Sequence, residues 1–152
     1  MAILLALLIG IVAGLRAMTA PAAVSWAAFL GWIDLGDSWL WWLGHWIAVA
    51  IFTALALFEL YNDQRPTTPS RTVPVQFGTR IVMGALASAA LGAASGSWIA
   101  GLVAGVVGAV IGTFGGKAAR ARLAASFGRD APAAYLEDAV AIIGALVIVL
   151  AA

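Results

Sequence analysis

The sequence predicts an all-α integral membrane protein, a polytopic transmembrane helix bundle with about five spans. Hydrophobic residues make up 64% of the 152-residue chain and charged residues only 10%. Soluble domains are about 45–50% apolar and about 25% charged, so a soluble chain of this length would have too little charge to cover its surface. The chain contains no cysteine, which excludes disulfides and thiolate metal sites.

The length of the apolar runs places the expected spans. A spanning helix needs about 20 mostly apolar residues. The first run, residues 1–15, is shorter than this when it meets Arg16. Four further runs follow it, and we expect spans at residues 39–58, 81–97, 98–116 and 131–152.

The distribution of basic residues orients the predicted bundle. Segments 62–80 and 117–130 hold seven of the eight Lys and Arg residues, and five spans put both segments on one side. The positive-inside rule makes that side cytoplasmic, with the N-terminus in and the C-terminus out. All seven tryptophans fall near the predicted outer side. Trp favours the membrane–water interface, so their placement agrees with this orientation. Only Arg16 departs from this pattern, and we expect it on the outer side.

The stretch Leu-Arg-Ala-Met-Thr-Ala-Pro at residues 15–21 predicts a break in the first helix. Pro21 disfavours helical geometry at the preceding residue and has no N–H to donate. We expect a new helix to start near Pro21, with Thr19 as its N-cap. A broken helix exposes N–H groups and a positive dipole end, which suits an anion. The alternative is that Arg16 snorkels to the outer interface and Pro21 merely starts an interfacial helix.

A weak internal similarity indicates two repeat halves within a single transmembrane domain, residues 1–152. Gly-Ile-Val-Ala-Gly at 10–14 aligns with Gly-Ala-Val-Ile-Gly at 108–112. The halves would be 1–61 and 98–152, joined by loop 62–80 and span 81–97, and an odd number of crossings would invert the second half. The counterpart break would fall at residues 113–117, so that Arg16 and Lys117 mark two ends of a pseudo-symmetric path. Chance similarity between Ala/Gly-rich helices is the alternative.

Glycines at spacings of three and four predict close helix packing. The stripe is Gly101, Gly105, Gly108, Gly112 and Gly116, and Gly10/Gly14 and Gly92/Gly96 repeat the spacing. Packing within the bundle is the simpler interpretation, and a seam in a homo-oligomer is the alternative.

Charged residues of the predicted cytoplasmic side form the candidate site. Burying a carboxylate at membrane depth costs free energy unless the carboxylate is paired with a cation or serves a function. Glu59, Glu137 and Asp138 could pair with Arg80 and Lys117 as a structural clamp, or they could bind a proton or cation, or leave positive charge for a phosphate or lipid headgroup. The candidate residues are Arg16, Thr19, Glu59, Asp63, Arg80, Lys117, Glu137 and Asp138.

Other chemistry has no visible signature. The sequence has no GxSxG, P-loop or HExxH motif and no EF-hand spacing. We therefore expect no enzyme activity, cofactor or metal, and no nucleic-acid partner. The lone histidine, His45, lies in a Trp-rich stretch and is expected at the interface rather than as a ligand.

The order of the charged motifs resembles the DUF4126 family of small bacterial membrane proteins over nearly the whole chain. The motifs are Gly14-Leu-Arg-Ala17, Phe58-Glu59 with Asp63 and Pro66, Arg80 with Gly84-Ala-Leu86, Lys117 with Arg120 and Arg122, and Leu136-Glu-Asp138. The loop at 67–72 departs from the more acidic and aromatic segment expected there. The resemblance implies a multi-pass protein of the bacterial inner (cytoplasmic) membrane. The family has no assigned function, so the resemblance implies no activity, ligand or catalytic residue.

Two functions stay open at this point. The first is a small inverted-repeat transporter or channel-like carrier for an anionic solute or lipid headgroup. Arg16 and Lys117 would contact the anion, and Glu59, Glu137 and Asp138 would gate or couple transport. The second is a non-transporting scaffold or assembly factor that docks lipid or a partner through its basic cytoplasmic face. Transport predicts a water-accessible path to the deep charges, whereas a scaffold predicts a dry bundle with its charges mutually paired.

Overall fold

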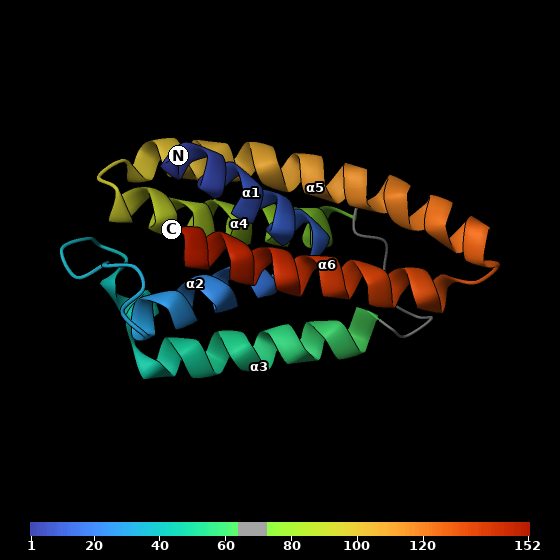
Figure 1. The fold of residues 1–152 in the computed structure, drawn as a ribbon, viewed down its shortest axis with the longest axis horizontal. Coiled ribbons are helices and arrows are strands. Elements are labelled where there is room, and N and C mark those ends of the chain that lie inside the picture. Colours follow the sequence, from blue (N-terminus) through green and yellow to red (C-terminus); the bar gives the residue numbers. More distant parts are fainter. Residues whose placement is uncertain (64–72) are drawn as a thin grey trace.

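The computed structural model describes residues 1–63 and 73–152, and the regular secondary structure in these residues is helical (Figure 1). Six α-helices and one short 3₁₀ helix, η1, make up this part of the chain, which confirms the all-α prediction. In chain order they are α1 (Ala2–Leu15), α2 (Thr19–Phe29), η1 (Trp41–Gly44), α3 (Trp46–Asp63), α4 (Pro74–Ala94), α5 (Trp98–Phe127) and α6 (Asp130–Ala151).

Four helices, α3 to α6, are long and apolar enough to cross a membrane, so the fold is that of a multi-pass membrane protein. The first helix, α1, has only 14 residues, about 21 Å of helix. After it the chain turns back at Arg16, and α2 returns toward the end from which α1 came (Figure 1). The prediction of about five spans is corrected on this point, because α1 and α2 form a helical hairpin in place of a fifth span.

The two ends of the bundle differ in composition. One end, here called the aromatic end, holds Met1, residues 30–45, the turn between α4 and α5, and Ala152; the opposite end is the charged end. Met1, Ala2, Ala151 and Ala152 line one small cavity of about 220 Å³ at the aromatic end. The prediction that the two termini lie on opposite sides is therefore wrong, because the hairpin brings the chain back once more than five spans would.

Helix boundaries follow local signals that outweigh hydropathy. Span 39–58 was expected to begin at Trp39, but residues up to His45 form turns and η1, and α3 begins at Trp46. Backbone at His45 is extended, which ends η1 before α3 starts. Helix α4 begins seven residues earlier than expected, because Pro74 is at its first turn, where a missing N–H costs nothing.

Helix α5 is continuous through the glycines at 115 and 116 and reaches Phe127. The expected counterpart break at residues 113–117 is therefore absent, since two glycines alone lower helix propensity without removing a hydrogen bond. Helices α1 and α5 also both run from the aromatic end toward the charged end (Figure 1). An inverted repeat requires matched helices to run in opposite directions, so the predicted inversion of α1 relative to α5 is wrong.

The glycine stripe brings α1, α4 and α5 into backbone contact. A Cβ added at Gly10 would lie 2.6 Å from the carbonyl oxygen of Gly105, and one at Gly14 would lie 2.5 Å from that of Ala109. The glycines of α5 likewise face α4 and α1. The similarity between segments 10–14 and 108–112 thus reflects two helices that pack on each other through matching small residues. This confirms packing within the bundle as one use of the stripe.

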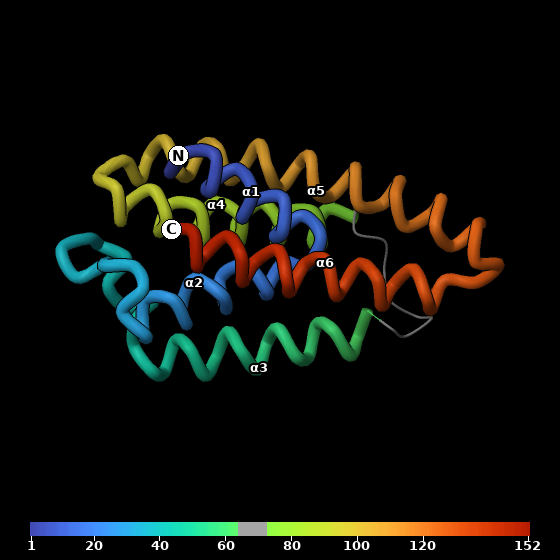
Figure 2. Tube along the Cα trace, viewed as in Figure 1, coloured from blue at the N-terminus to red at the C-terminus, as the bar shows by residue number. Residues whose placement is uncertain are grey.

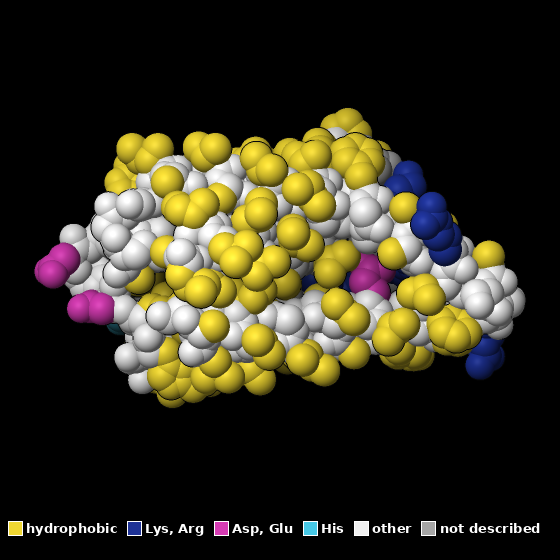
Figure 3. All heavy atoms as spheres, turned by 45° about the horizontal axis from the view of Figure 1, so that its top comes forward, with side chains coloured by type: hydrophobic (Ala, Val, Ile, Leu, Met, Phe, Trp, Pro, Cys, Tyr) yellow, Lys and Arg dark blue, Asp and Glu magenta, His cyan; other side chains and the backbone are white. Residues whose placement is uncertain are grey.

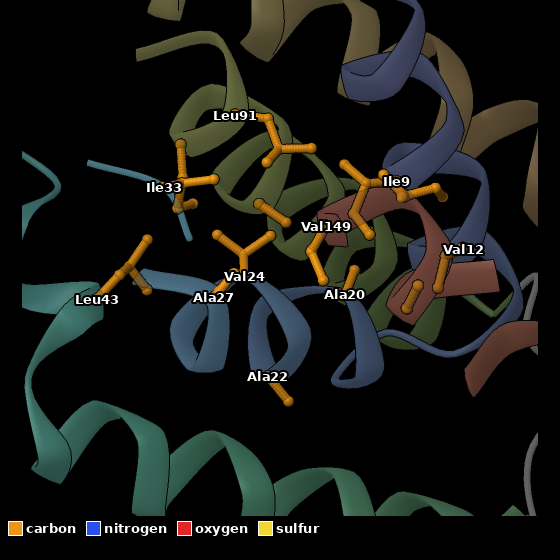
Figure 4. Packing of buried hydrophobic residues seen from close by; sticks show 14 of the residues in the cluster. Ile9, Val12, Ala20, Ala22, Val24, Ala27, Ile33, Leu43, Leu91 and Val149 are labelled. Carbon is orange, nitrogen blue, oxygen red and sulfur yellow. The ribbon is translucent and has the colours of Figure 1, made fainter. Parts of the chain in front are cut away.

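Helix α2 fills the centre of the aromatic half. Val24 and Ala27 of α2 are completely buried, and Figure 4 shows them directed toward Leu91 of α4 and Ile33 of the following loop. The side of α2 that carries Ala22 faces α3 (Figure 4). These contacts make the centre of this half predominantly apolar.

Helix α3 lies at the edge of the bundle (Figure 2). It packs on α2 and η1 and makes no comparable interface with α4, α5 or α6 in the described part of the chain. Only 17% of its 18-residue apolar segment is buried, compared with 39–44% for the corresponding segments of the other three long helices. Its attachment to the bundle therefore depends strongly on the polar contacts described next.

Candidate functional site

The break between α1 and α2 is capped by a carboxylate from another helix. Glu59 of α3 accepts hydrogen bonds from the backbone N–H groups of Ala17 and Met18, at 2.8 Å each. These N–H groups precede the first turn of α2, where the helix dipole is positive and donors have no partner within the helix. The position that suits an anion is therefore occupied by the protein's own carboxylate.

The other side of the break is held by a cation. Arg80 of α4 is 3% exposed, and its Nη1 donates to the carbonyl oxygens of Gly14 and Leu15 at 2.7 and 2.8 Å. Carbonyls in the last turn of a helix lack intrahelical donors and carry the negative dipole end. Irregular backbone at membrane depth is tolerated only where such groups are satisfied, and Glu59 and Arg80 satisfy them.

Arg16 is completely buried and is surrounded by carboxylates. Its Nη1 lies 2.5 Å from Asp63 of α3 and 3.5 Å from Glu137 of α6. Its Nε donates to Asp138 of α6 at 2.5 Å, and Nη2 contacts the same carboxylate oxygen. Arg16 therefore joins the hairpin to α3 and α6, and its guanidinium plane is engaged by acidic partners.

Arg120 of α5 links this buried cluster to the charged end. Its Nη1 lies 2.8 Å from Asp63 and 3.9 Å from Glu137. Its Nε and Nη2 bind Asp130 at the start of α6, at 3.0 and 2.6 Å. The Asp130 side chain is 62% exposed. A continuous series of ion pairs thus runs from the surface at Asp130 through Arg120 and Asp63 to Arg16.

The deep charges form one layer across the bundle. In α3, α4 and α6, and at the end of α1, the deepest charged residue stands 13 or 14 positions from the aromatic end of its helix. At 1.5 Å per residue this is a depth of about 20 Å, in a hydrocarbon core about 30 Å thick. The residues of the layer are Arg16, Glu59, Arg80, Glu137 and Asp138. Ionisable residues at this depth are expensive and usually mark function.

The space-filling view agrees with this arrangement. In Figure 3 acidic side chains lie recessed among hydrophobic ones toward the charged end, and Lys and Arg side chains cluster on that end alone. All six basic residues of the described chain, Arg16, Arg80, Lys117, Arg120, Arg122 and Arg129, belong to this half. Arg16 was expected on the outer side, and that prediction is wrong because the hairpin tip, not a loop, carries it.

Thr19, Glu59 and Arg80 show contacts that the sequence did not predict. Thr19 was expected as the N-cap of α2, but it is the first helical residue, and Met18 precedes it without a side-chain cap. The capping comes from Glu59, which stands 40 positions later in the sequence. Arg80 was expected to pair with the carboxylates, and the structure shows it donating hydrogen bonds to two backbone carbonyls, which sequence periodicity cannot identify.

Arg16 and Lys117 do not mark two ends of a path. Gly14 contacts Gly112 and Thr113, so Lys117 is only about one helical turn farther along α5 and lies in the same half as Arg16. The Lys117 side chain is exposed, whereas Arg16 is buried. Arg120 and Asp130 were not among the candidate site residues. They are ten positions apart, on either side of the turn between α5 and α6. Opposite charges at this spacing across a helix turn could have indicated the ion pair.

Buried hydroxyl groups add a smaller polar feature within the bundle. Ser88 of α4 donates to the carbonyl oxygen of Ala6 at 2.7 Å. Thr113 and Ser25 are also completely buried, and their hydroxyl oxygens have no hydrogen-bond partner within the described structure. In residues 1–63 and 73–152 no three His, Asp or Glu side chains are grouped to hold a metal ion.

The comparisons with known proteins concern the whole chain. The family model for a domain of unknown function, DUF4126, matches residues 3–152. Among curated proteins and solved structures, none matches the chain. The match includes every residue of the hairpin tip and of the charged layer. The protein therefore belongs to the DUF4126 family.

Proposed function

We propose that this protein is a small membrane carrier in which an anionic group, of a solute or a lipid headgroup, exchanges with Glu59 at the start of α2. The observation that carries the proposal is the pair of hydrogen bonds from Ala17 and Met18 to the Glu59 carboxylate. Backbone N–H groups at the start of a broken helix bind anions in many transport folds. Here the bound anion is a side chain that can leave with its helix.

The packing of α3 supports such an exchange. Helix α3 is the least buried of the long helices, and its polar attachments include Glu59 at the break and Asp63 on Arg16 and Arg120. An outward movement of α3 would uncover the two N–H groups and release Arg16 from Asp63. An incoming carboxylate or phosphate would then replace the negative charge that α3 withdraws.

The direction of access follows from the ion pairs. The series from Asp130 to Arg16 opens at the charged end, and apolar packing around Val24 closes the route toward the aromatic end. We infer that this conformation is closed toward the aromatic end. The positive-inside rule makes the charged end cytoplasmic, and both chain ends would then face the other side of the membrane.

A scaffold is the second candidate, and one observation favours it. Arg16 is inaccessible and its charge is met by Asp63, Glu137 and Asp138. Such mutual pairing is what a static bundle requires. Exposed Lys117, Arg122 and Arg129 would then dock anionic lipid or a partner at the charged end.

Cysteine accessibility distinguishes the two, because the natural chain has no cysteine. Single cysteines at Thr19, Gly115 and Ser126, in reconstituted vesicles, are treated with a membrane-impermeant maleimide from each side. Ser126, exposed on the last turn of α5, reports the charged end. The carrier predicts that Thr19→Cys reacts from that side and that inorganic phosphate or sulfate slows the reaction. If Thr19→Cys stays unreactive with and without these anions while Ser126→Cys labels, the carrier proposal fails and the scaffold remains.

A further inference from the structure

An apolar groove runs along the lipid-facing side of the bundle between α3 and α6, with α2 as its floor. Its volume is about 410 Å³. From α2 come Thr19, Ala23 and Trp26, and α3 and α6 contribute aliphatic walls that include Ala56 and Leu146. The groove exists because α3 packs on α2 but not on α6.

The groove offers almost nothing but hydrocarbon contact. Trp26 Nε1 donates to the hydroxyl of Thr53 at 2.9 Å, so two of its polar groups satisfy each other. The remaining lining consists of Ala, Leu, Ile, Val, Trp and Thr side chains without a charge. A charged or strongly hydrogen-bonding ligand would lose its hydration there without compensation.

The size of the groove selects among apolar occupants. It extends along the 11 residues of α2, about 16 Å. This length and the uncharged aliphatic walls suit an unbranched hydrocarbon chain that lies along α2.

The depth of the groove matches one leaflet. It begins near Trp32 and Leu30 at the aromatic end and stops at Thr19 and Leu60, beside the charged layer. Half of a hydrocarbon core about 30 Å thick is about 15 Å, which is close to the length of the groove. Its long axis follows α2, α3 and α6 and so runs across the bilayer as acyl chains do.

We propose that this groove is a phospholipid site that holds one acyl chain from the leaflet at the aromatic end. The occupant fills the space that α3 leaves against α6 and holds the edge helix in place through apolar contact. This inference does not depend on transport, since a scaffold would retain the same lipid.

Retention of lipid by the purified full-length protein tests the proposal. Native mass spectrometry in a mild detergent counts phospholipids bound per chain. Ala56→Phe places a ring in the groove, and Ala54→Phe places the same ring on the exposed side of α3. We expect one retained phospholipid in the wild type and in Ala54→Phe, and at least a tenfold loss of that species in Ala56→Phe. Equal retention in both variants, or none in the wild type, overturns the proposal.

A second measurement needs no variant. The wild-type chain is reconstituted in phosphatidylcholine that carries a diazirine at the middle of one acyl chain, and adducts are mapped after illumination. We expect adducts at Ala23, Ala56 and Leu146 to exceed those at the exposed residues Leu55 and Ile99 by about tenfold. An even distribution would show only bulk lipid, and cross-links to a second copy within the groove would show a protein occupant; either result overturns the proposal.

Discussion

Arg16 and Asp138 are 122 positions apart in the sequence, yet the Nε of Arg16 donates to Asp138 at 2.5 Å. The bond joins the tip of the N-terminal hairpin to the last helix, inside the apolar band of the bundle. Because Arg16 is completely buried and Asp138 is largely buried, each helps the charge of the other to be tolerated. The predictions below test this layer and the packing that supports it.

Loss of the central cation should be strongly destabilising. Arg16→Gln leaves Asp63, Glu137 and Asp138 facing one another without their shared partner. Breaking a buried ion pair by removing one member costs about 3–5 kcal/mol. We expect a loss of this size in chemical unfolding in detergent. Arg122→Gln, on the exposed face of α5, is the control and should change stability by less than about 0.5 kcal/mol; similar losses in both would contradict the role of Arg16.

Removal of the Glu59 carboxylate should loosen the hairpin tip selectively. In Glu59→Gln one of the two N–H groups of Ala17 and Met18 meets an amide donor in place of an acceptor. A hydrogen bond to a charged group is worth about 1.5–3 kcal/mol, so amide exchange at these residues should accelerate about 10- to 100-fold. Hydrogen exchange measures this directly, with Asp37→Asn at the aromatic end as the control. Unchanged exchange at residues 17–18 would show that the tip does not need the cap.

Two glycines of α5 should respond to alanine in opposite directions. A Cβ at Gly105 would collide with the backbone and side chain of α4, whereas a Cβ at Gly115 would meet nothing within 4 Å. Gly105→Ala is therefore expected to destabilise by more than about 2 kcal/mol, since overpacking costs about 1–3 kcal/mol. Gly115→Ala should stabilise by about 0.5–1 kcal/mol through higher helix propensity. Thermal unfolding measures the stability of the two variants. Equal changes in stability would mean that α4 and α5 do not pack this closely.

Buried hydroxyls with and without partners should also differ. Thr113→Val removes a hydroxyl that has no hydrogen-bond partner within the described structure, so we expect a gain of about 1 kcal/mol. Ser88→Ala removes the donor to Ala6, and we expect a loss of about 0.5–1 kcal/mol. Both are measured by reversible unfolding in detergent. A loss in Thr113→Val as large as that in Ser88→Ala would indicate that the Thr113 hydroxyl is in use.

Both chain ends should face the same compartment. Cysteines at Ala2 and Ala151, which line one cavity at the aromatic end, are expected to react with an impermeant reagent from the same side of sealed vesicles. A cysteine at Ser126 should react only from the other side. Reaction of Ala2→Cys and Ala151→Cys from opposite sides would restore an odd number of crossings.

The sequence predicts the class, the last helix and the separation of aromatic and charged ends, because each depends on composition or on local periodicity. Residues 131–152 were expected as a span, and α6 runs from Asp130 to Ala151. The break at residues 16–20 was also expected, since Pro21 acts locally. These features need no knowledge of which helices are neighbours.

The partners in the charged layer could not be predicted in the same way. Glu59 finds the N–H groups of Ala17 and Met18, and Arg80 finds two carbonyls, because α1, α3 and α4 meet there in space. The hydropathy pattern along the chain does not predict which residues of different helices come into contact. The matching glycines of α1 and α5 resembled a repeat in the sequence, whereas the structure shows them as two sides of one parallel contact. Residues 64–72 of the expected loop 62–80, with Arg65, Pro66 and Arg71, lie outside the described residues.

The parallel contact between α1 and α5 has a consequence for how the protein is made. Helix α1 leaves the ribosome first, but its close-packed partner follows about a hundred residues later, and the carboxylates of α6 that meet Arg16 come later still. Such long-range contacts form slowly. During synthesis the hairpin must therefore wait in the membrane with its arginine incompletely neutralised. A chain truncated before α6 would lack the two carboxylates, Glu137 and Asp138, that α6 brings to Arg16.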